Sequence, residues 1–319
     1  MSERSAATLH VTNGDSVLYL FKKAGILGTH VAWRDPLNEG PVPAGLPLEA
    51  TSAARVRYLC ERGYGNPIKV TYEFEKRDAQ MRKAVDFPEV VLWFEHDLFD
   101  QLHLLQILTV LDDMNLEPGR VSIVQSDQYL GSMIAEELSA LLPRRRPVTP
   151  ATSKSARRAW QRFTSPSPSD LLASAREDAI GLPFLRAALV RLCEEYPSSG
   201  DGLSRSQRQA LLAVAQGAAQ TPELYRRAQA REEATFQGDA AFARVLTDLS
   251  DSRAALLSET DGSFALTALG RHVIAGDADW LESYPIDRWI GGVHLTAEHV
   301  VRWDDAAGTF TDAGPKASS

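Results

Sequence analysis

The chain has 319 residues, of which 44% are hydrophobic and 24% are charged, and its formal net charge at pH 7 is −8. This composition is typical of a globular protein that is long enough for two domains. No apolar run approaches the ~18 residues that would suggest a membrane span, and the N-terminus lacks the pattern of a signal peptide. Cys60 and Cys193 are isolated, which argues against a disulfide framework. We therefore expect a cytoplasmic protein that does not act at a membrane and for which nucleic acid is a disfavoured partner.

The first 143 residues alternate short apolar runs with helical patterns. Such alternation predicts βαβ units, and therefore an α/β domain with a Rossmann-like, mostly parallel sheet over residues 1–143. The predicted strands are Thr8–Asn13, Thr29–Trp33, Val90–Phe94 and Arg120–Gln125. The predicted helices are Val17–Ala24, Leu48–Arg62, Lys69–Val85, Leu102–Leu111 and a segment near Ser132–Leu142.

Residues 144–182 are proline-rich and basic, and Glu137 and Asp170 are the acidic residues that flank the basic run. We interpret this segment as a linker between domains, with a short helix at Ser153–Phe163. A solvated connector is the favoured interpretation, and a phosphate-binding arm is the alternative. The basic residues of the run are Arg144, Arg145, Arg146, Lys154, Arg157, Arg158 and Arg162.

Residues 183–308 are predicted to form a mainly helical, winged-helix-like domain, and residues 309–319 a disordered tail. The predicted elements are helices at Phe184–Tyr196, Ser204–Gln216, Thr221–Gln229 and Ala240–Leu249, strands at Ala254–Leu257 and Ser263–Leu266, and a helix at Thr267–Ile274. Three helices followed by a hairpin resemble a winged-helix module only at the level of fold. Arg244 is the one basic residue of the candidate recognition helix, which favours an accessory or dimerising module over one that reads DNA.

Four of the predicted strands end in polar clusters. These clusters are Asn13-Gly14-Asp15-Ser16, Arg34-Asp35, Glu95-His96-Asp97 and Gln125-Ser126-Asp127. Open α/β sheets bind their ligands at the carboxyl ends of parallel strands, which all lie at one edge. The sequence therefore predicts that these clusters converge on a functional site.

The cluster that follows Val90–Phe94 contains the predicted catalytic residues, Glu95, His96, Asp97 and Asp100. Alternation along a strand places Glu95 and Asp97 on one side and His96 on the other. The carboxylates can hold Mg²⁺ or Mn²⁺ through oxygen ligands, or divide into a general acid and a general base. The structural alternative for Asp97 is to cap the helix that follows.

Gly14, Asp15 and Ser16 lie where a strand leads into a helix N-terminus, an arrangement that binds anions. The same residues weakly resemble the Gly-Asp-Ser nucleophile block of lipase-like hydrolases, but the companion Gly-x-Asn-Asp and late Asp-x-x-His blocks are missing. Their structural alternative is a helix cap. The planar guanidinium of Arg34 can bind a phosphate or carboxylate group of a ligand. The structural alternative is an ion pair with Asp35 or Glu95. The predicted ligand-binding residues are Asn13, Gly14, Asp15, Ser16, Arg34, Asp35, Glu39, Gln101, Asp287, Arg288 and His294.

Asp287, Arg288 and His294 surround the glycine pair Gly291-Gly292. Because glycine has no side chain, the backbone at such a pair can approach a ligand closely. The structural alternative is a surface ion pair between Asp287 and Arg288, with Trp289 packed in the core.

Several long motifs resemble an uncharacterised bacterial domain-of-unknown-function family, number eighteen thirty-five in the usual catalogue. In the N-terminal half they are H-V-T-N-G-D-S at His10–Ser16, W-R-D-P-L-N-E-G-P-V-P at Trp33–Pro43 and V-L-W-F-E-H-D-L-F-D-Q at Val91–Gln101. In the C-terminal half they are G-L-S-R-S-Q-R-Q at Gly202–Gln209 and I-D-R-W-I-G-G-V-H-L at Ile286–Leu295. The resemblance implies an α/β domain followed by a helical part, and it implies no activity.

The convergence of polar strand ends favours an enzyme, a hydrolase or transferase acting on a small phosphorylated or nucleotide-like ligand. The alternative is a regulator in which a ligand-sensing α/β domain is coupled to a winged-helix-like module that binds nucleic acid or protein.

Overall fold

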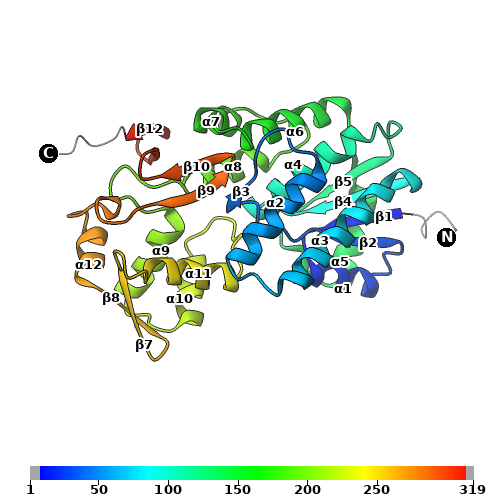
Figure 1. The fold of residues 1–319 in the computed structure, drawn as a ribbon. Coiled ribbons are helices and arrows are strands. Elements are labelled where there is room, and N and C mark those ends of the chain that lie inside the picture. Colours follow the sequence, from blue (N-terminus) through cyan, green and yellow to red (C-terminus); the bar gives the residue numbers. More distant parts are fainter. Residues whose placement is uncertain (1–7, 314–319) are drawn as a thin grey trace. The chain divides into compact units, whose positions relative to one another are not determined.

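The computed structural model describes residues 8–313 and divides them between two compact units (Figure 1). The first unit runs to Leu189 and includes Gly291–Val293, and the second consists of Val190–Ile290 and the residues from His294 onward. Within the described residues, no helix combines the length and the apolar character that crossing a lipid bilayer requires.

The first unit is built on a five-stranded sheet with the order β2-β1-β4-β5-β6. Its strands are β1 (Thr8–Thr12), β2 (Thr29–Ala32), β4 (Glu89–Phe94), β5 (Val121–Gln125) and β6 (Arg146–Pro147). The first four are parallel and β6 is antiparallel to β5. Residues Val90–Phe94 are fully buried, as expected of a strand covered on both faces. The predicted α/β fold with a mostly parallel sheet is confirmed.

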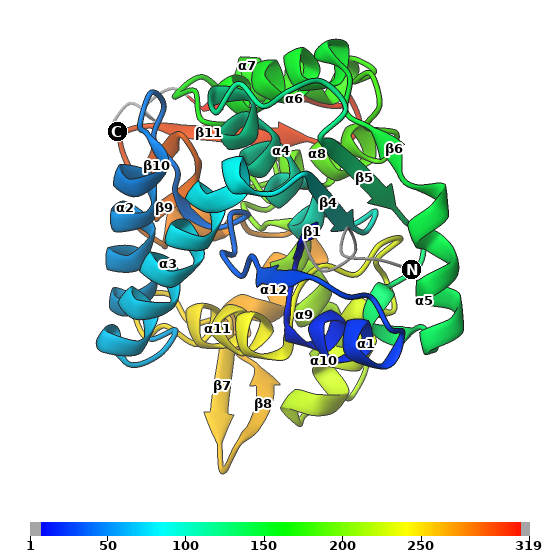
Figure 2. The same ribbon diagram turned by 90° about the vertical axis from the view of Figure 1, so that its right-hand side faces the viewer.

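Helices cover both faces of this sheet (Figure 2). On one face, α1 (Asp15–Lys23) and α5 (Ala135–Leu141) pack against Val91 and Trp93 of β4. On the other face, α4 (Leu98–Asp113) packs against α6 (Pro150–Phe163). The remaining elements of the unit are β3 (Gly40–Pro41), α2 (Leu48–Glu61), α3 (Pro67–Arg82), η2 (Lys83–Asp86), η3 (Leu130–Ser132), η4 (Leu142–Arg144) and α7 (Pro168–Arg176).

The basic segment 144–182 is part of the first unit, which differs from the predicted linker. Its helix α6 starts at Pro150 and buries Ala156, Ala159 and Phe163. The basic run from Arg144 to Arg162 has no acidic residues of its own, and four of its arginines pair with carboxylates that lie outside the run. Arg145 pairs with Glu89, Arg157 with Asp112 and Asp113, and Arg158 and Arg162 with Glu177. These pairs offset part of the positive charge that a phosphate-binding arm would use, and the arm stays a prediction.

The second unit has a helical core followed by a hairpin. α8 (Leu185–Cys193) leads into it, and its own elements are α9 (Arg205–Ala215), α10 (Thr221–Gln229), α11 (Asp239–Leu249), β7 (Leu257–Thr260), β8 (Ser263–Leu266), α12 (Ala268–Ala275) and η5 (Trp280–Glu282). Leu211, Phe242, Leu246 and Trp280 are buried in one cluster. The element order agrees with the sequence, although β7 starts three residues after the predicted Ala254. The winged-helix likeness stays a prediction.

The C-terminal end contains four strands, β9 (Asp287–Gly291), β10 (Val293–Thr296), β11 (Val300–Asp304) and β12 (Thr309–Ala313). The prediction of a disordered tail from residue 309 is therefore wrong up to Ala313, and residues 314–319 lie outside the described part. β12 pairs antiparallel with β11. The ring of Phe310 packs against Tyr196 and Trp303, with centroid distances of 4.6 and 5.2 Å. One partly buried aromatic side chain thus anchors a segment whose other residues are small and polar.

Candidate functional site

The sheet of the first unit has a topological switch point between β1 and β4. These strands are parallel neighbours, with Thr12 beside Trp93 in the register. The helix that follows β1 lies on one face of the sheet and the helix that follows β4 lies on the other (Figure 2). Open α/β sheets commonly bind ligands outside the carboxyl ends of the two strands where the connections diverge in this way.

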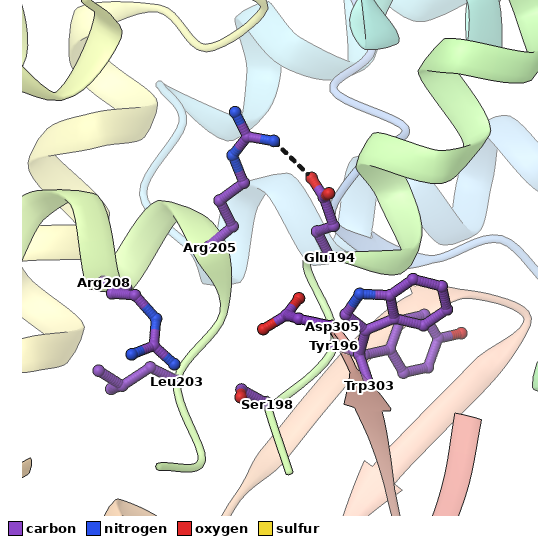
Figure 3. A pocket seen from close by; sticks show the side chains of 8 residues that line it. All are labelled: Glu194, Tyr196, Ser198, Leu203, Arg205, Arg208, Trp303 and Asp305. Carbon is purple, nitrogen blue, oxygen red and sulfur yellow. Dashed lines mark hydrogen bonds and ion pairs between the residues drawn. The ribbon is translucent and has the colours of Figure 1, made fainter. Parts of the chain in front are cut away.

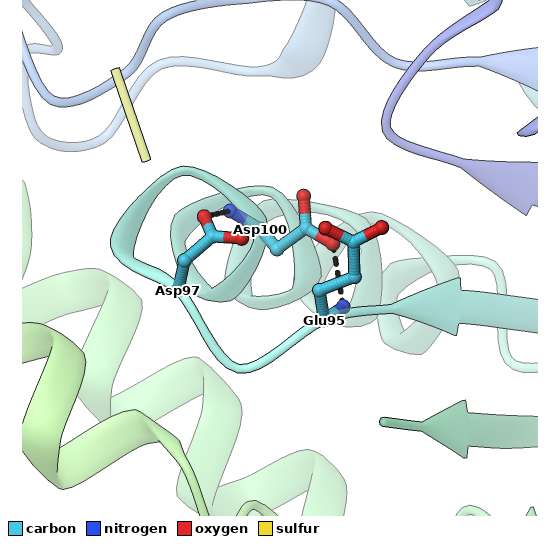
Figure 4. Close-up of side chains that lie close together, drawn as sticks. All are labelled: Glu95, Asp97 and Asp100. Atoms are coloured by element: carbon cyan, nitrogen blue, oxygen red, sulfur yellow. Dashed lines mark hydrogen bonds between the residues drawn. The ribbon is translucent and has the colours of Figure 1, made fainter. Parts of the chain in front are cut away.

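Three carboxyl groups meet just beyond the carboxyl end of β4, those of Glu95, Asp97 and Asp100 (Figure 4). One oxygen of each lies within 4.8 Å of the others, and the side chains are buried. Asp97 is the N-cap of α4, and its Oδ1 accepts a hydrogen bond of 3.1 Å from the Asp100 N–H. The cap predicted as the structural alternative for Asp97 is therefore present, and it coexists with membership of the cluster.

Neutral donors hold these carboxyl groups in place. Asn13 Nδ2 donates to Asp100 Oδ1 at 2.7 Å, and the Glu95 N–H donates to Asp100 Oδ2 at 2.5 Å. The Leu130 N–H, at the start of η3, donates to Glu95 Oε1 at 2.7 Å. Gln101 Nε2 donates to the Glu95 carbonyl at 2.6 Å. The structure thus brings together Asn13, Gln101 and three of the four predicted catalytic residues.

Burial and mutual repulsion keep these groups from ionising together. Burial, with the charge of Asp97 as the second cause, raises the pKa of Glu95 to about 7. Burial also raises the pKa of Asp97 to about 6 and holds the pKa of Asp100 well above its ordinary value. The backbone N–H groups of η3 oppose the shift at Glu95 without cancelling it. At neutral pH the cluster must therefore retain protons or bind a cation.

His96 lies apart from the carboxyl set. Its half-buried ring contacts Tyr129 and Phe184, with centroid distances of 5.2 and 6.0 Å. Its Nδ1 is buried and has no hydrogen-bond partner among the described residues. The predicted separation of His96 from the two neighbouring carboxylates agrees with this arrangement.

The start of α1 lies beside η3. Gly14 is the N-cap of α1 and supplies no side-chain cap, so Asp15 and Ser16 are not the caps that the structural alternative proposed. A Cβ added to Gly131 would lie 3.0 Å from Ser16 Oγ, which shows how closely the two segments approach. The N-terminus of α1 is therefore next to the segment that holds Glu95.

Arg34 pairs with Asp15, and its Nη1 lies 3.1 Å from Glu73 Oε2. Neither Asp35 nor Glu95 is its partner, so both ion pairs considered from the sequence are wrong. The side chains of Arg34, Asp15 and Glu73 are all at least partly exposed. The guanidinium is accordingly held at the surface near the start of α1 by weak, solvated pairs.

Asp35 and Glu39 belong to a structural network that the sequence did not reveal. Asp35 is fully buried, and its Oδ1 accepts a hydrogen bond of 2.8 Å from Arg55 Nε. The same guanidinium donates to the carbonyls of Pro36 and Glu39 at 2.9 and 2.7 Å. Arg55 lies in α2, where the sequence gives no sign that distinguishes it from a surface arginine. It fixes the Gly/Pro-rich loop that follows β2.

Asp287, Arg288 and His294 belong to the second unit. Arg288 donates to the carbonyl and to Oε2 of Glu195, each at 3.0 Å. His294 Nε2 lies 2.7 Å from Asp287 Oδ1, and its ring stacks on Trp289 at 4.2 Å. The surface pair between Asp287 and Arg288 is therefore wrong, because each residue pairs elsewhere.

Gly291 and Gly292 are explained by contact with the chain itself. The Gly292 N–H donates to the Phe163 carbonyl at 3.1 Å, and a Cβ on Gly292 would lie 1.9 Å from the Thr164 carbonyl oxygen. Gly291 has a φ of 58°. The sequence analysis expected this glycine pair to let backbone approach a ligand, whereas the close approach in the structure is made to the end of α6.

Comparison of the chain with protein-family models and with curated proteins found no match. The resemblance of its motifs to the domain-of-unknown-function family stays a prediction.

Proposed function

We propose that the first unit is a hydrolase or transferase that acts on a small phosphorylated or nucleotide-like molecule with the help of Mg²⁺ or Mn²⁺. The observation that carries this proposal is the meeting of Glu95, Asp97 and Asp100 at the topological switch point of the sheet. Buried carboxyl groups are costly unless they are protonated, paired or bound to metal. No arginine or lysine pairs with these three among the described residues, which leaves protons or a cation.

The donor set fits a hard divalent cation, since Mg²⁺ and Mn²⁺ prefer carboxylate oxygens. Such an ion would polarise a phosphoryl oxygen and offset its charge. Asp97 keeps one oxygen on the helix cap, and Asn13 and Leu130 orient the carboxyl groups of Asp100 and Glu95. The protein thereby fixes the ligand oxygens before any ion arrives.

The phosphate of the substrate would lie toward the start of α1. The N–H groups of the first turn of a helix are unpaired and attract anions. A Cβ added to Gly14 would meet no atom within 4 Å, so backbone access is open there. Arg34 supplies a cation beside the same turn through its pair with Asp15.

Glu95 is the best candidate for moving a proton. A pKa of about 7 allows a carboxyl group to gain and lose a proton near neutral pH, which is the requirement for general acid–base catalysis. A bound cation would lower this pKa and favour the carboxylate. The same residue can therefore act as ligand or base according to the occupancy of the site.

The test is a thermal-shift and calorimetric titration with Mg²⁺ and Mn²⁺, followed by nucleotides and sugar phosphates in the presence of the ion. Asp97→Asn removes a charge but keeps a good helix cap. Asp86→Asn, at an exposed position before β4, is the matched control. We expect stabilisation of wild type and control by the ion and at least a tenfold weaker effect in Asp97→Asn. Equal ion binding in all three proteins, or none, would overturn the proposal.

The regulator hypothesis had two supports in the sequence, the basic segment and the element order of the second unit. The pairing of Arg145, Arg157, Arg158 and Arg162 with carboxylates weakens the first support. The regulator hypothesis stays a prediction that rests mainly on the element order of the second unit.

A further inference from the structure

The second unit contains a pocket of its own, distinct from the carboxyl cluster (Figure 3). Its volume is about 150 Å³. A cavity of this size accommodates a molecule such as benzene. The apolar part of its lining consists of Tyr196, Leu203 and Trp303, which are buried. A small organic molecule with one short apolar part fits these dimensions.

Backbone hydrogen bonds fix the walls of this pocket. The Trp303 N–H donates to the Pro197 carbonyl and the Ser199 N–H donates to the Trp303 carbonyl, each at 2.8 Å. The Ser198 N–H donates to the Leu203 carbonyl, also at 2.8 Å. A pocket that is formed before the ligand arrives avoids the entropic cost of ordering it.

The polar side of the pocket carries charges of both signs. Arg205 and Arg208 lie one turn apart on α9 and both line it. Arg205 pairs with Glu194 at 2.8 Å, as Figure 3 shows, and Arg208 pairs with Asp201 at 2.5 Å. Each guanidinium has five N–H donors, so these pairs leave donors for a further acceptor.

Asp305 is the charge without a partner. Among the residues that the structure describes, it has no hydrogen bond and no ion pair, and it lines the pocket beside Trp303. Figure 3 shows its carboxylate on the side of the indole that faces Ser198 and Arg208. Its negative charge also contributes to raising the pKa of Glu194, for which burial is the main cause. A ligand cation at this position would relieve both effects.

We propose that this pocket binds a small zwitterion with an ammonium and a carboxylate group, of which a free α-amino acid is the simplest. The ammonium would pair with Asp305 beside the face of Trp303, where the π-system also attracts a cation. The carboxylate would accept hydrogen bonds from Arg208 and from the Ser198 hydroxyl. A short side chain would lie against the apolar part of the lining. This proposal is independent of the chemistry of the first unit.

The experiment is isothermal titration of the full chain with standard L-amino acids, together with the matching amine that lacks the carboxylate and the matching acid that lacks the ammonium. We expect one or more amino acids to bind and both truncated probes to bind at least tenfold more weakly. A hydrogen bond to a charged group contributes about 1.5–3 kcal/mol, which corresponds to a tenfold effect or more.

Two variants locate the site. Asp305→Asn removes an unpaired, exposed charge, so the fold is unaffected, and Arg208→Lys keeps the charge opposite Asp201 but loses the fork. Asp261→Asn, an exposed position in the β7–β8 turn of the same unit, is the control. We expect tenfold weaker binding in the first two and none of this loss in the control. The proposal is overturned by the absence of amino-acid binding, by equal binding of a truncated probe, or by binding that survives both pocket variants.

Discussion

Asn13 and Asp100 are separated by 87 positions in the sequence, yet Asn13 Nδ2 donates a 2.7 Å hydrogen bond to Asp100 Oδ1. This bond joins the end of β1 to the first turn of α4. It gives a buried carboxyl group a partner without adding charge to a cluster that already repels itself. The amide at position 13 therefore keeps the number of carboxyl groups in the cluster at three.

Replacing Asn13 by Asp places a fourth carboxyl group in the cluster. We expect the metal-free variant to be less stable than wild type by about 2 kcal/mol or more at pH ~8, because an unpaired buried charge is costly. The deficit should shrink at pH ~5, where the cluster is protonated, and on addition of Mn²⁺. Urea denaturation at both pH values measures it. Asn66→Asp, which keeps the N-cap of α3, serves as control. A deficit independent of both pH and Mn²⁺ would contradict the role given to Asn13.

The metal-free protein should lose stability as the pH rises. The pKa of Glu95 is raised from 4.5 to about 7 on folding, so between these values the folded state keeps a proton that the unfolded state releases. Stability then falls through this window, by on the order of 3 kcal/mol for Glu95. Glu95→Gln should flatten the profile, and saturating Mg²⁺ should flatten it in wild type. Equal pH profiles for wild type and Glu95→Gln in denaturant titrations would show that Glu95 is not the group concerned.

Much of the first unit was predictable because its signals are local. Val90–Phe94 reads as a buried strand, and the polar residues after it fall at the carboxyl edge by topology alone. The role of Leu130 was not predictable, since any residue can offer a backbone N–H to Glu95. The partners of the arginines in α6 were equally hidden. These arginines pair with Asp112, Asp113 and Glu177, and no local sequence pattern links those carboxylates to the arginines.

Arg55 is another residue whose partners no local sequence pattern indicates, and it contacts the loop that follows β2. Its guanidinium is fully buried and donates to Asp35 and to three backbone carbonyls. We expect Arg55→Met to destabilise the first unit by about 3–5 kcal/mol, because Asp35 is left as an unpaired buried charge. Arg55→Met combined with Asp35→Asn should recover part of this loss. Arg82→Met, which breaks an exposed pair with Glu49, should cost less than about 1 kcal/mol. Chemical denaturation distinguishes the variants, and equal losses in Arg55→Met and Arg82→Met would refute the assignment of Arg55 as an anchor.

Gly292 and Gly14 differ in the space that the structure leaves for a side chain. A Cβ on Gly292 would lie 1.9 Å from the Thr164 carbonyl oxygen, whereas a Cβ on Gly14 would meet nothing within 4 Å. Gly14 has a φ of −172°, which any residue adopts. We expect Gly292→Ala to destabilise the protein by about 1–3 kcal/mol or more through overpacking, and Gly14→Ala to leave its thermal midpoint nearly unchanged. If the two substitutions shift the midpoint equally, the contact with α6 is not the reason for the glycine at position 292. If Gly14→Ala alone weakens nucleotide or phosphate binding at unchanged stability, the backbone at the start of α1 is the anion contact that the proposed function requires.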